Sequence, residues 1–362
     1  MNPFHATLAT VLLAASLTQA AQVSPAPKIP APPAGMFAPP GRAITHVTGD
    51  LYRANNGGWH VAFLVTPDGI VLVDTLNTAF ATWLKAELAT RFPGKPVKVV
   101  IESHSHWDHA EGGAVFRDTA TFIGQEGMLR NMDGRFPALP GDIVDRNEDG
   151  YIDIAEVEQP FLDRLWYCGA TRGAVTGKDR DGDGRASPAE FFAEVVKPDI
   201  AYSDRMTLRF GGKTIELVYP GRNHADDSTA VLFTDERVLF GADFPADALV
   251  QGSLRSLPSA CGPFDGHPLR EWIGSYRTLE ALDFDLLIGG HGNRPFTKAE
   301  MAEGRVFLET LVREVEAAMR RGESLAQMKR SIRLAQYQDW AHYDALREPN
   351  IEAAYRNLRI HK

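Results

Sequence analysis

The sequence predicts a mixed α/β fold, and three observations predict it. Between residues 61 and 123, apolar strands alternate with a helix, an order that packs helices on a sheet. Between residues 206 and 240, short apolar segments are separated by turn residues, as in hairpins. From residue 298 the pattern is helical. Because 44% of the 362 residues are hydrophobic, the chain can bury a sizeable core in one large domain or two ordinary ones.

The first 22 residues predict export. They lack acidic residues and contain an apolar stretch, Leu8–Leu17, which is followed by small residues. No Lys or Arg precedes the stretch, and it is shorter than the roughly twenty apolar residues of a membrane span. We therefore expect a signal peptide over residues 1–22, cleaved near Ala20 or Ala21, and a periplasmic or secreted protein that spans no membrane. Residues 23–42, crowded with Pro and Ala, predict a linker.

Residues 43–126 predict strands, then a helix, then strands. Thr66-Pro-Asp-Gly69 has the turn chemistry of a hairpin, and Pro93-Gly94 would end the helix. The expected strands lie within Ile44–Asn55, Val61–Asp74, Val97–Ile101 and Ala120–Ile123, and the expected helix is Ala79–Phe92.

Residues 201–296 predict a second group of strands and one helix. Met206–Tyr219 alternates and turns at Gly211-Gly212, which predicts a hairpin. Further strands are expected at Thr229–Phe233, Val238–Phe240 and Phe284–Ile288, and a helix at Pro268–Leu282. Residues 297–362 form a helical C-terminal extension in which Met301–Met319 is strongly amphipathic.

Three imidazoles and a carboxylate follow the strand Val97–Ile101 within six residues: His104, His106, Asp108 and His109. Burying so many polar groups without partners is costly. A metal ion, or a pair of ions, would satisfy them, because imidazole nitrogen and carboxylate oxygen are ligands of Zn²⁺ and similar ions. The alternative is a solvated His-rich loop.

His-x-His-x-Asp-His after a strand resembles the metal-binding signature of the metallo-β-lactamase superfamily. Other motifs of that family recur in order: a strand ending at Asp74, then Gly221-Arg-Asn-His224, Phe240-Gly-Ala-Asp243-Phe and Ile288-Gly-Gly-His291-Gly. The resemblance covers roughly residues 44–125 and 205–295. It implies an αββα sandwich, in which two mixed sheets are faced by helices, built from residues 43–126 and 201–296.

The resemblance also implies a site for two zinc ions. His104, His106 and His224 would hold the first ion, Asp108, His109 and His291 the second, and Asp243 would bridge them. Such a pair shares a water and lowers its pKa, so that a bridging hydroxide becomes the nucleophile. Asp108 could also orient that water. Asp74 and Asp226 or Asp227 are candidates for fixing the ligating imidazoles, and Ser228 and Thr229 are expected to shape the loop.

Two segments of residues 127–200 fit the EF-hand calcium loop, with oxygen ligands at positions 1, 3, 5, 7, 9 and 12 and Gly at position 6. The first would use Asp145, Asn147, Asp149, Tyr151, Asp153 and Glu156; the second Asp179, Asp181, Asp183, Arg185, Ser187 and Glu190. The two begin 34 residues apart, which predicts an inserted helical EF-hand pair binding one or two Ca²⁺. Ile154–Tyr167 would leave the first loop as a helix. Pro137, Pro140 and Gly141 predict that the helix entering the first loop is short or absent. Acidic turns without metal, or a chance match, are the alternative.

Charge supports a discrete insert. Residues 142–194 hold 13 acidic and 6 basic residues, and the whole chain has a net charge of −9. Such a cluster repels itself unless cations bind it, so we expect calcium to be structural. The acidic balance also argues against a nucleic-acid partner. The two cysteines, Cys168 and Cys261, could form a disulfide in an oxidising compartment or stay unpaired.

The expected function is that of a metal-dependent hydrolase acting on a small molecule. Asp243 resembles the lactonase, glyoxalase-type and broader hydrolase branches of the family, which favours an ester, lactone, thioester or amide. The alternatives are a metallo-β-lactamase that cleaves β-lactams, a mononuclear iron oxygenase, and a calcium-binding protein with a vestigial site. The sequence gives no prediction of oligomeric state.

Overall fold

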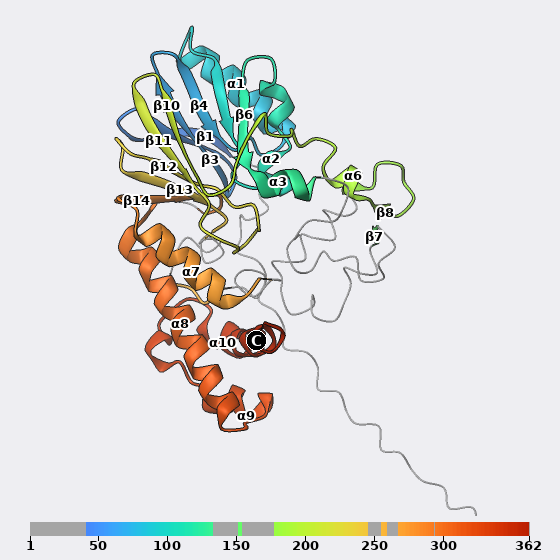
Figure 1. The fold of residues 1–362 in the computed structure, drawn as a ribbon, viewed down its shortest axis with the longest axis vertical. Helices are drawn as coiled ribbons and strands as arrows, with labels where there is room; N and C mark the ends of the chain where they lie inside the picture. The colour runs from blue at the N-terminus through green and yellow to red at the C-terminus, as the bar shows by residue number, and fades with distance from the viewer. Residues whose placement is uncertain are drawn as a thin grey trace, which may run out of the picture.

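The computed structural model describes residues 41–132, 151–153, 177–244, 255–258, 267–292 and 294–361. Several predictions fall outside these ranges: the signal peptide, almost all of the linker, both cysteines, the helix expected at Ile154–Tyr167 and most of the first calcium loop. Figure 1 shows two sheets packed together, with helices on their outer sides.

Within the described residues, the first sheet has seven strands in the order β1-β2-β3-β4-β5-β6-β9. Strands β1, β2, β3 and β4 pair antiparallel, each with the next. Strands β4, β5, β6 and β9 pair parallel in the same way. The crossover from β4 to β5 is made by helix α1. The bounds are β1 Arg42–Thr48, β2 Leu51–Asn56, β3 Trp59–Thr66, β4 Gly69–Val73, α1 Thr78–Arg91, β5 Val97–Ile101, β6 Thr121–Gln125 and β9 Ile200–Tyr202.

The second sheet has six strands among the described residues, in the order β10-β11-β12-β13-β14-β15. All neighbours are antiparallel except β13 and β14, which are parallel because helix α7 connects them. The bounds are β10 Arg205–Phe210, β11 Lys213–Val218, β12 Ala230–Phe233, β13 Val238–Ala242, α7 Leu269–Glu280, β14 Leu286–Gly289 and β15 Phe296–Thr297.

Apolar side chains on both faces of the two sheets form three hydrophobic cores. One lies between the sheets, and one lies between each sheet and its helices. On β3, Phe63 faces α1 and packs with Phe80, whereas Leu64 faces the second sheet. On β12, Val231 faces the first sheet and Leu232 faces α7 and α8. Because side chains alternate between the two faces of a strand, each sheet has an apolar inner face and an apolar outer face. The predicted mixed α/β fold is confirmed, and its layers are those expected of the αββα sandwich.

Helices follow the second sheet to the end of the described chain. They are α8 Lys298–Arg320, α9 Leu325–Ser331, the short 3₁₀ helix η4 Ala335–Tyr337 and α10 Tyr343–Ile360. A capping box at Thr297 begins α8, whose buried face includes Leu308 and Leu311 and packs on α7. In the part of the chain that the structure describes, no helix combines the length and apolarity that crossing a membrane requires.

Some predicted boundaries were wrong. Arg42, expected in the linker, is the first residue of β1, because its backbone pairs with that of Asn56. Ile200, expected in the insert, begins β9, which pairs with β6. The insert was expected to begin at residue 127, and the short helix α3, Glu126–Asn131, crosses that boundary. Edge pairings such as these depend on a partner strand and leave little pattern at the edge residue itself.

Candidate metal centre

The candidate site lies where parallel strands of both sheets end. Asp74 directly follows β4, and His104 lies three residues after the end of β5. In the second sheet Asp243 follows β13, and His291 follows β14. The carboxyl ends of adjacent parallel strands open toward the same edge, where ligand sites of α/β proteins form. His224, in the connection between β11 and β12, reaches the same edge.

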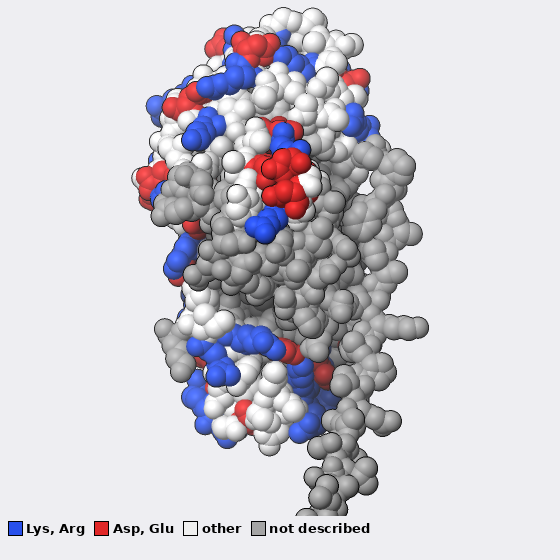
Figure 2. Space-filling view, turned by 90° about the vertical axis from the view of Figure 1, so that its right-hand side faces the viewer, with Lys and Arg blue, Asp and Glu red and all other residues white. Residues whose placement is uncertain are grey.

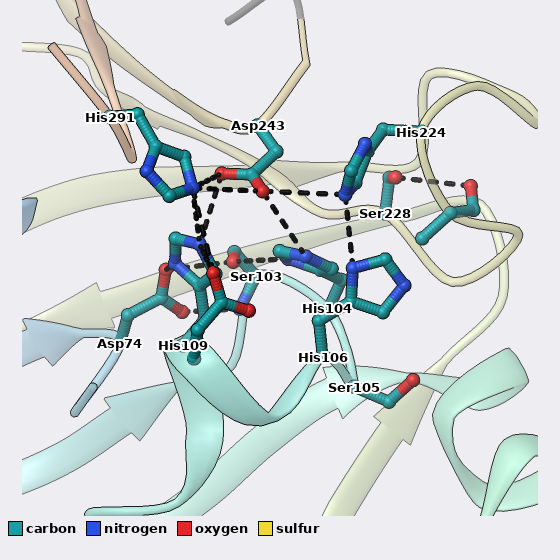
Figure 3. Close-up of polar contacts among 12 residues, drawn as sticks. Asp74, Ser103, His104, Ser105, His106, His109, His224, Ser228, Asp243 and His291 are labelled. Carbon is teal, nitrogen blue, oxygen red and sulfur yellow. Dashed lines mark hydrogen bonds and ion pairs between the residues drawn. The ribbon is translucent and has the colours of Figure 1, made fainter. Parts of the chain in front are cut away.

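The structure brings together all seven residues that the motifs predict as metal ligands. They form two groups whose ligand-type atoms lie within 4.8 Å of one another, and Asp243 belongs to both: His104, His106, His224 and Asp243, and Asp108, His109, Asp243 and His291. In Figure 3 His104, His106 and His109 rise from one side and meet Asp243, His224 and His291 from the other. The motifs, which are far apart in the sequence, therefore meet at one site.

In the first group, imidazole nitrogens face one another. His224 Nε2 lies 3.0 Å from His106 Nδ1 and 3.3 Å from Asp243 Oδ2. His104 Nε2 is buried, has no hydrogen-bond partner and lies 3.9 Å from Asp243 Oδ2. Burial, followed by the neighbouring histidines, lowers the pKa of His104 well below its ordinary value. A neutral imidazole with a free inward lone pair is the form that ligates a metal.

In the second group, two imidazoles face one carboxylate oxygen of Asp243 and one of Asp108. Oδ1 of Asp243 lies 3.0 Å from His109 Nε2 and 3.1 Å from His291 Nε2, and those two nitrogens are 3.2 Å apart. Oδ2 of Asp108 lies 3.5 Å from His109 Nε2 and 3.6 Å from His291 Nε2. Protons cannot satisfy so many converging acceptors at once, so this donor set suits a divalent cation.

Asp74 fixes the first sheet's side of the site. Its Oδ2 accepts from the Ser103 hydroxyl at 2.8 Å and lies 3.2 Å from His109 Nδ1, while Oδ1 accepts from the Ser103 backbone N–H at 2.8 Å. This partnership leaves Nε2 of His109 facing Asp243. Asp74 has a φ of 66°, which is uncommon outside glycine and places its carboxyl under the metal motif.

The other acidic candidates hold the loops around the site, Asp227 through a backbone N–H and Asp226 through a side-chain amide. Asp227 Oδ2 accepts from the Ser105 backbone N–H at 3.0 Å, and Asp226 accepts from Asn131 at 2.8 Å. Burial raises the pKa of Asp227 to about 6. Ser228 donates to Asn223 at 2.8 Å, and the Thr229 backbone N–H donates to the carbonyl oxygen of Ser103. These contacts support the prediction that Ser228 and Thr229 shape the loop.

Sequence reasoning missed four residues at this site. Ser103 links Asp74 to His104, and Trp59 donates a hydrogen bond to Asp108. Gly290 leaves no room for a side chain beside His109. Glu102 is buried and its carboxyl has no hydrogen-bond partner, so burial raises its pKa well above the ordinary value. Trp59, Glu102 and Ser103 are not motif positions, and Gly290 lies within the motif Ile288-Gly-Gly-His291-Gly, where the pattern alone does not show what its missing side chain leaves room for.

The second acidic loop is described in full, from Asp179 to Glu190. Oxygens of Asp179, Asp181 and Glu190 lie within 4.8 Å of one another. Asp179 accepts from the backbone N–H groups of Gly182 and Gly184, at 2.7 and 2.9 Å. The Ser187 hydroxyl donates to Glu190 at 2.8 Å, and Ser187 therefore has a role in the loop besides the expected one of ligand.

Of the first acidic loop only residues 151–153 are described. Strand β7, Ile152–Asp153, pairs antiparallel with β8, Arg185–Ala186, and Ile152 lies opposite Ala186. These two residues occupy the same position, the eighth, in the two predicted loops. Asp145, Asn147, Asp149 and Glu156 lie outside the described residues. Figure 2, which faces the side carrying α6 (Pro188–Phe191) and β8, shows a patch of acidic side chains near the centre of the view, with basic side chains beside it.

Comparison with known proteins shows what parts of this chain are similar to. A family model described as Metallo-beta-lactamase superfamily matches residues 57–124. The alpha subunit of 2,4-dinitroanisole O-demethylase from Nocardioides sp. is 24% identical over 257 residues, which is 70% of this chain and 58% of that protein. The chain therefore spans little more than half of this curated relative.

Solved structures with a similar fold include a stereoselective inverting sec-alkylsulfatase from Pseudomonas sp. It is 18% identical, has a TM-score of 0.59, and the match covers 87% of this chain and 50% of that one. A metallo-β-lactamase from Pontibacter korlensis is 16% identical, with a TM-score of 0.47, over 74% of this chain and 99% of that one. The matched segment 57–124 carries four of the seven clustered residues, which indicates a metal-dependent enzyme. Residues 57–124 thus resemble the metallo-β-lactamase superfamily, and the sandwich is shared with the sec-alkylsulfatase.

Proposed function

We propose that this chain is a dinuclear, zinc-dependent hydrolase that cleaves an ester, lactone, thioester or amide. The observation that carries the proposal is the convergence of seven ligand-type side chains in two groups that share Asp243. His104, His106 and His224 would hold one ion, and Asp108, His109 and His291 the other. When bound, the ions would supply an activated water and polarise the bond to be cleaved.

The protein's own groups divide the remaining work. Asp74 holds Nδ1 of His109, so that Nε2 stays directed at the site. The side chain of Asp108 is 31% exposed, whereas those of His109 and Asp243 are at most 5% exposed. Asp108 is therefore the carboxylate of this group that can meet solvent and substrate. We assign to its carboxylate the orientation of the attacking water and the acceptance of its proton.

Asp243 guides the choice of substrate, because a carboxylate at this position resembles the lactonase and glyoxalase-type branches more than the β-lactamases proper. The similar proteins add further substrate classes to test, because one is an alkylsulfatase and another is a subunit of a dinitroanisole O-demethylase. A hydrolysis screen should therefore place acyl lactones, carboxylic esters, thioesters and amides beside β-lactams, a secondary alkyl sulfate and a nitroaryl methyl ether.

The screen is run on purified protein loaded with Zn²⁺, and elemental analysis accompanies it. We expect two equivalents of zinc and turnover of at least one carboxylic ester, lactone, thioester or amide. Preference for β-lactams would replace the proposed substrate class with the alternative one. A single bound iron and oxygen consumption would overturn the hydrolase, and no bound transition metal would overturn the metal site itself.

Asp74→Asn is expected to weaken zinc binding by about 10- to 100-fold, as removal of an outer partner of a metal ligand does. The neutral amide cannot accept from both Ser103 and His109 as the carboxylate does. Zinc affinity is measured by competition with a chelator. Asp68→Asn, the same change at an exposed turn residue, is the control and should leave the affinity unchanged. Equal affinities in the two variants would contradict the role of Asp74.

We further propose that the two acidic loops form an EF-hand pair that binds structural Ca²⁺. Support comes from the clustered oxygens of Asp179, Asp181 and Glu190 and from the pairing of equivalent positions through β7 and β8. The second loop is attached to the metal motif. Phe191 packs on the ring of Trp107, with centroids 5.5 Å apart, and Lys178 forms an ion pair with Glu111. Ordering the loop would therefore brace α2, Trp107–Ala110, which carries Asp108 and His109.

Glu190→Gln is expected to weaken calcium binding, because position 12 supplies the bidentate ligand. In the unaltered protein, calcium at about 100 times its Kd should stabilise the fold by about 2.7 kcal/mol through mass action. The variant should lose most of this gain. Thermal unfolding at fixed Zn²⁺, with and without Ca²⁺, measures it, and Glu314→Gln on α8 is the matched control. A calcium-dependent rise in Tm that survives in Glu190→Gln would contradict this site.

Export is the last part of the proposal, and the composition of residues 1–22 supports it. Expression of the full chain in a Gram-negative host should yield periplasmic protein whose N-terminus, by mass spectrometry, follows Ala20 or Ala21. Cytoplasmic protein with an intact N-terminus would contradict it.

A further inference from the structure

Trp59, the first residue of β3, contacts two residues of the second group of ligand-type side chains. Its indole Nε1 donates a hydrogen bond to Asp108 Oδ2 at 3.1 Å. Its ring lies edge-on to that of His291, with centroids 5.3 Å apart and an interplanar angle of 65°. The backbones of Trp59 and His291 also form an isolated bridge. None of the sequence motifs includes Trp59.

The backbone around Trp59 is joined to the segment that follows β14. The His60 backbone N–H donates to Gly290 at 2.7 Å, and the Gly292 backbone N–H donates to Gly58 at 3.0 Å. The His60 ring Nε2 lies 2.8 Å from the Gly292 carbonyl oxygen. Since β3 belongs to the first sheet and β14 to the second, these bonds join the two sheets next to the site. The backbone of Trp59 is therefore held in place relative to both sheets.

The oxygen that Trp59 contacts is the one that faces the cluster. Asp108 Oδ2 lies 3.5 Å from His109 Nε2 and 3.6 Å from His291 Nε2. Asp108 is also the most exposed member of its group, at 31%. A partly exposed carboxylate without a donor is free to rotate toward water, whereas a donor on Oδ2 selects the rotamer that faces the histidines. An indole N–H suits this task because it donates and does not accept.

We propose that Trp59 is a positioning residue for the second metal site, where its N–H holds Asp108 Oδ2 toward His109 and His291. This inference rests on the proposed dinuclear function and adds a residue to it. The inference predicts an effect on the second metal site and none on the first. Trp59 contacts Asp108 and His291, and both belong to the second group alone.

Trp59→Phe tests the inference, because phenylalanine keeps an aromatic ring beside His291 and removes the N–H. We expect the affinity for the second metal equivalent to fall by about 10- to 100-fold, while the first equivalent binds as before. Stepwise titration of the metal-free protein with Co²⁺, followed by visible absorption and chelator competition, measures both. Trp83→Phe is the matched control, since Trp83 lies half-buried on α1 and packs on Phe80.

The outcomes separate the two proposals. Wild-type protein that binds fewer than two ions would overturn the dinuclear function itself. Wild-type protein that binds two, with an unchanged second affinity and cobalt spectrum in Trp59→Phe, would overturn only the role of Trp59. Should the variant fail to fold, the indole N–H resonance of Trp59 in wild-type protein decides. It is expected to shift in Asp108→Asn, and an unchanged resonance would overturn the inference.

Discussion

Replacing Asp243 by alanine is expected to lower kcat/KM by at least about 10³-fold on the substrate that the screen identifies. Asp243 is the one clustered residue that belongs to both groups of ligand-type side chains among the described residues. Its Oδ1 faces His109 and His291, and its Oδ2 faces His224. Without it, Asp108 would be the one carboxylate left among the seven clustered residues to offset the charge of two cations, so we also expect bound metal to fall below two equivalents.

Steady-state kinetics and elemental analysis on the same preparation measure this effect. Asp118→Ala makes the same chemical change at an exposed position, where the carboxylate pairs with Lys85. A surface pair of this kind contributes at most about 1 kcal/mol, so the control should keep its activity and its metal. If Asp243→Ala keeps two bound ions and at least a tenth of the wild-type rate, the shared position of Asp243 is not what the chemistry needs.

The second large effect is expected from Gly290→Ala, which adds one methyl group in the middle of the site. A Cβ built there would lie 2.7 Å from His109 Cε1 and 2.8 Å from Asp243 Oδ1. His109 cannot move aside freely, because Asp74 holds its Nδ1. The ligands must therefore shift, and misplacement by about 1 Å can cost about 100-fold in rate. We expect a loss of that size in kcat/KM, with weaker binding of the second metal.

Gly274→Ala is the control for this change. Gly274 lies in α7, and nothing lies within 4 Å of a Cβ built on it. Alanine there should leave kcat/KM unaltered and can stabilise the helix by up to about 1 kcal/mol. Comparison of kcat/KM, metal content and Tm for the two variants tests the close packing at Gly290. Full activity in Gly290→Ala would contradict it.

Local patterns in the sequence were enough for much of the fold. The strand Val97–Ile101 has the predicted bounds, because a short apolar run ends there at polar ligand-type residues. The helix α1 differs from its predicted bounds by one residue at each end, since Asn77 caps it and Pro93 follows it. Where pairing with another strand decides, as for Arg42 and Ile200, the predicted boundaries were wrong by one residue.

The sequence by itself determined the mixed α/β class, the order of the motifs and the seven residues that meet at the site. These were accessible because ligand chemistry restricts the residue types, and because strand ends place them at recurring positions. The tertiary structure alone decided how Trp59 reaches Asp108, how Ser103 joins Asp74 to His104, and why Gly290 must be small. Those roles depend on distances between segments remote in sequence, which no local pattern encodes.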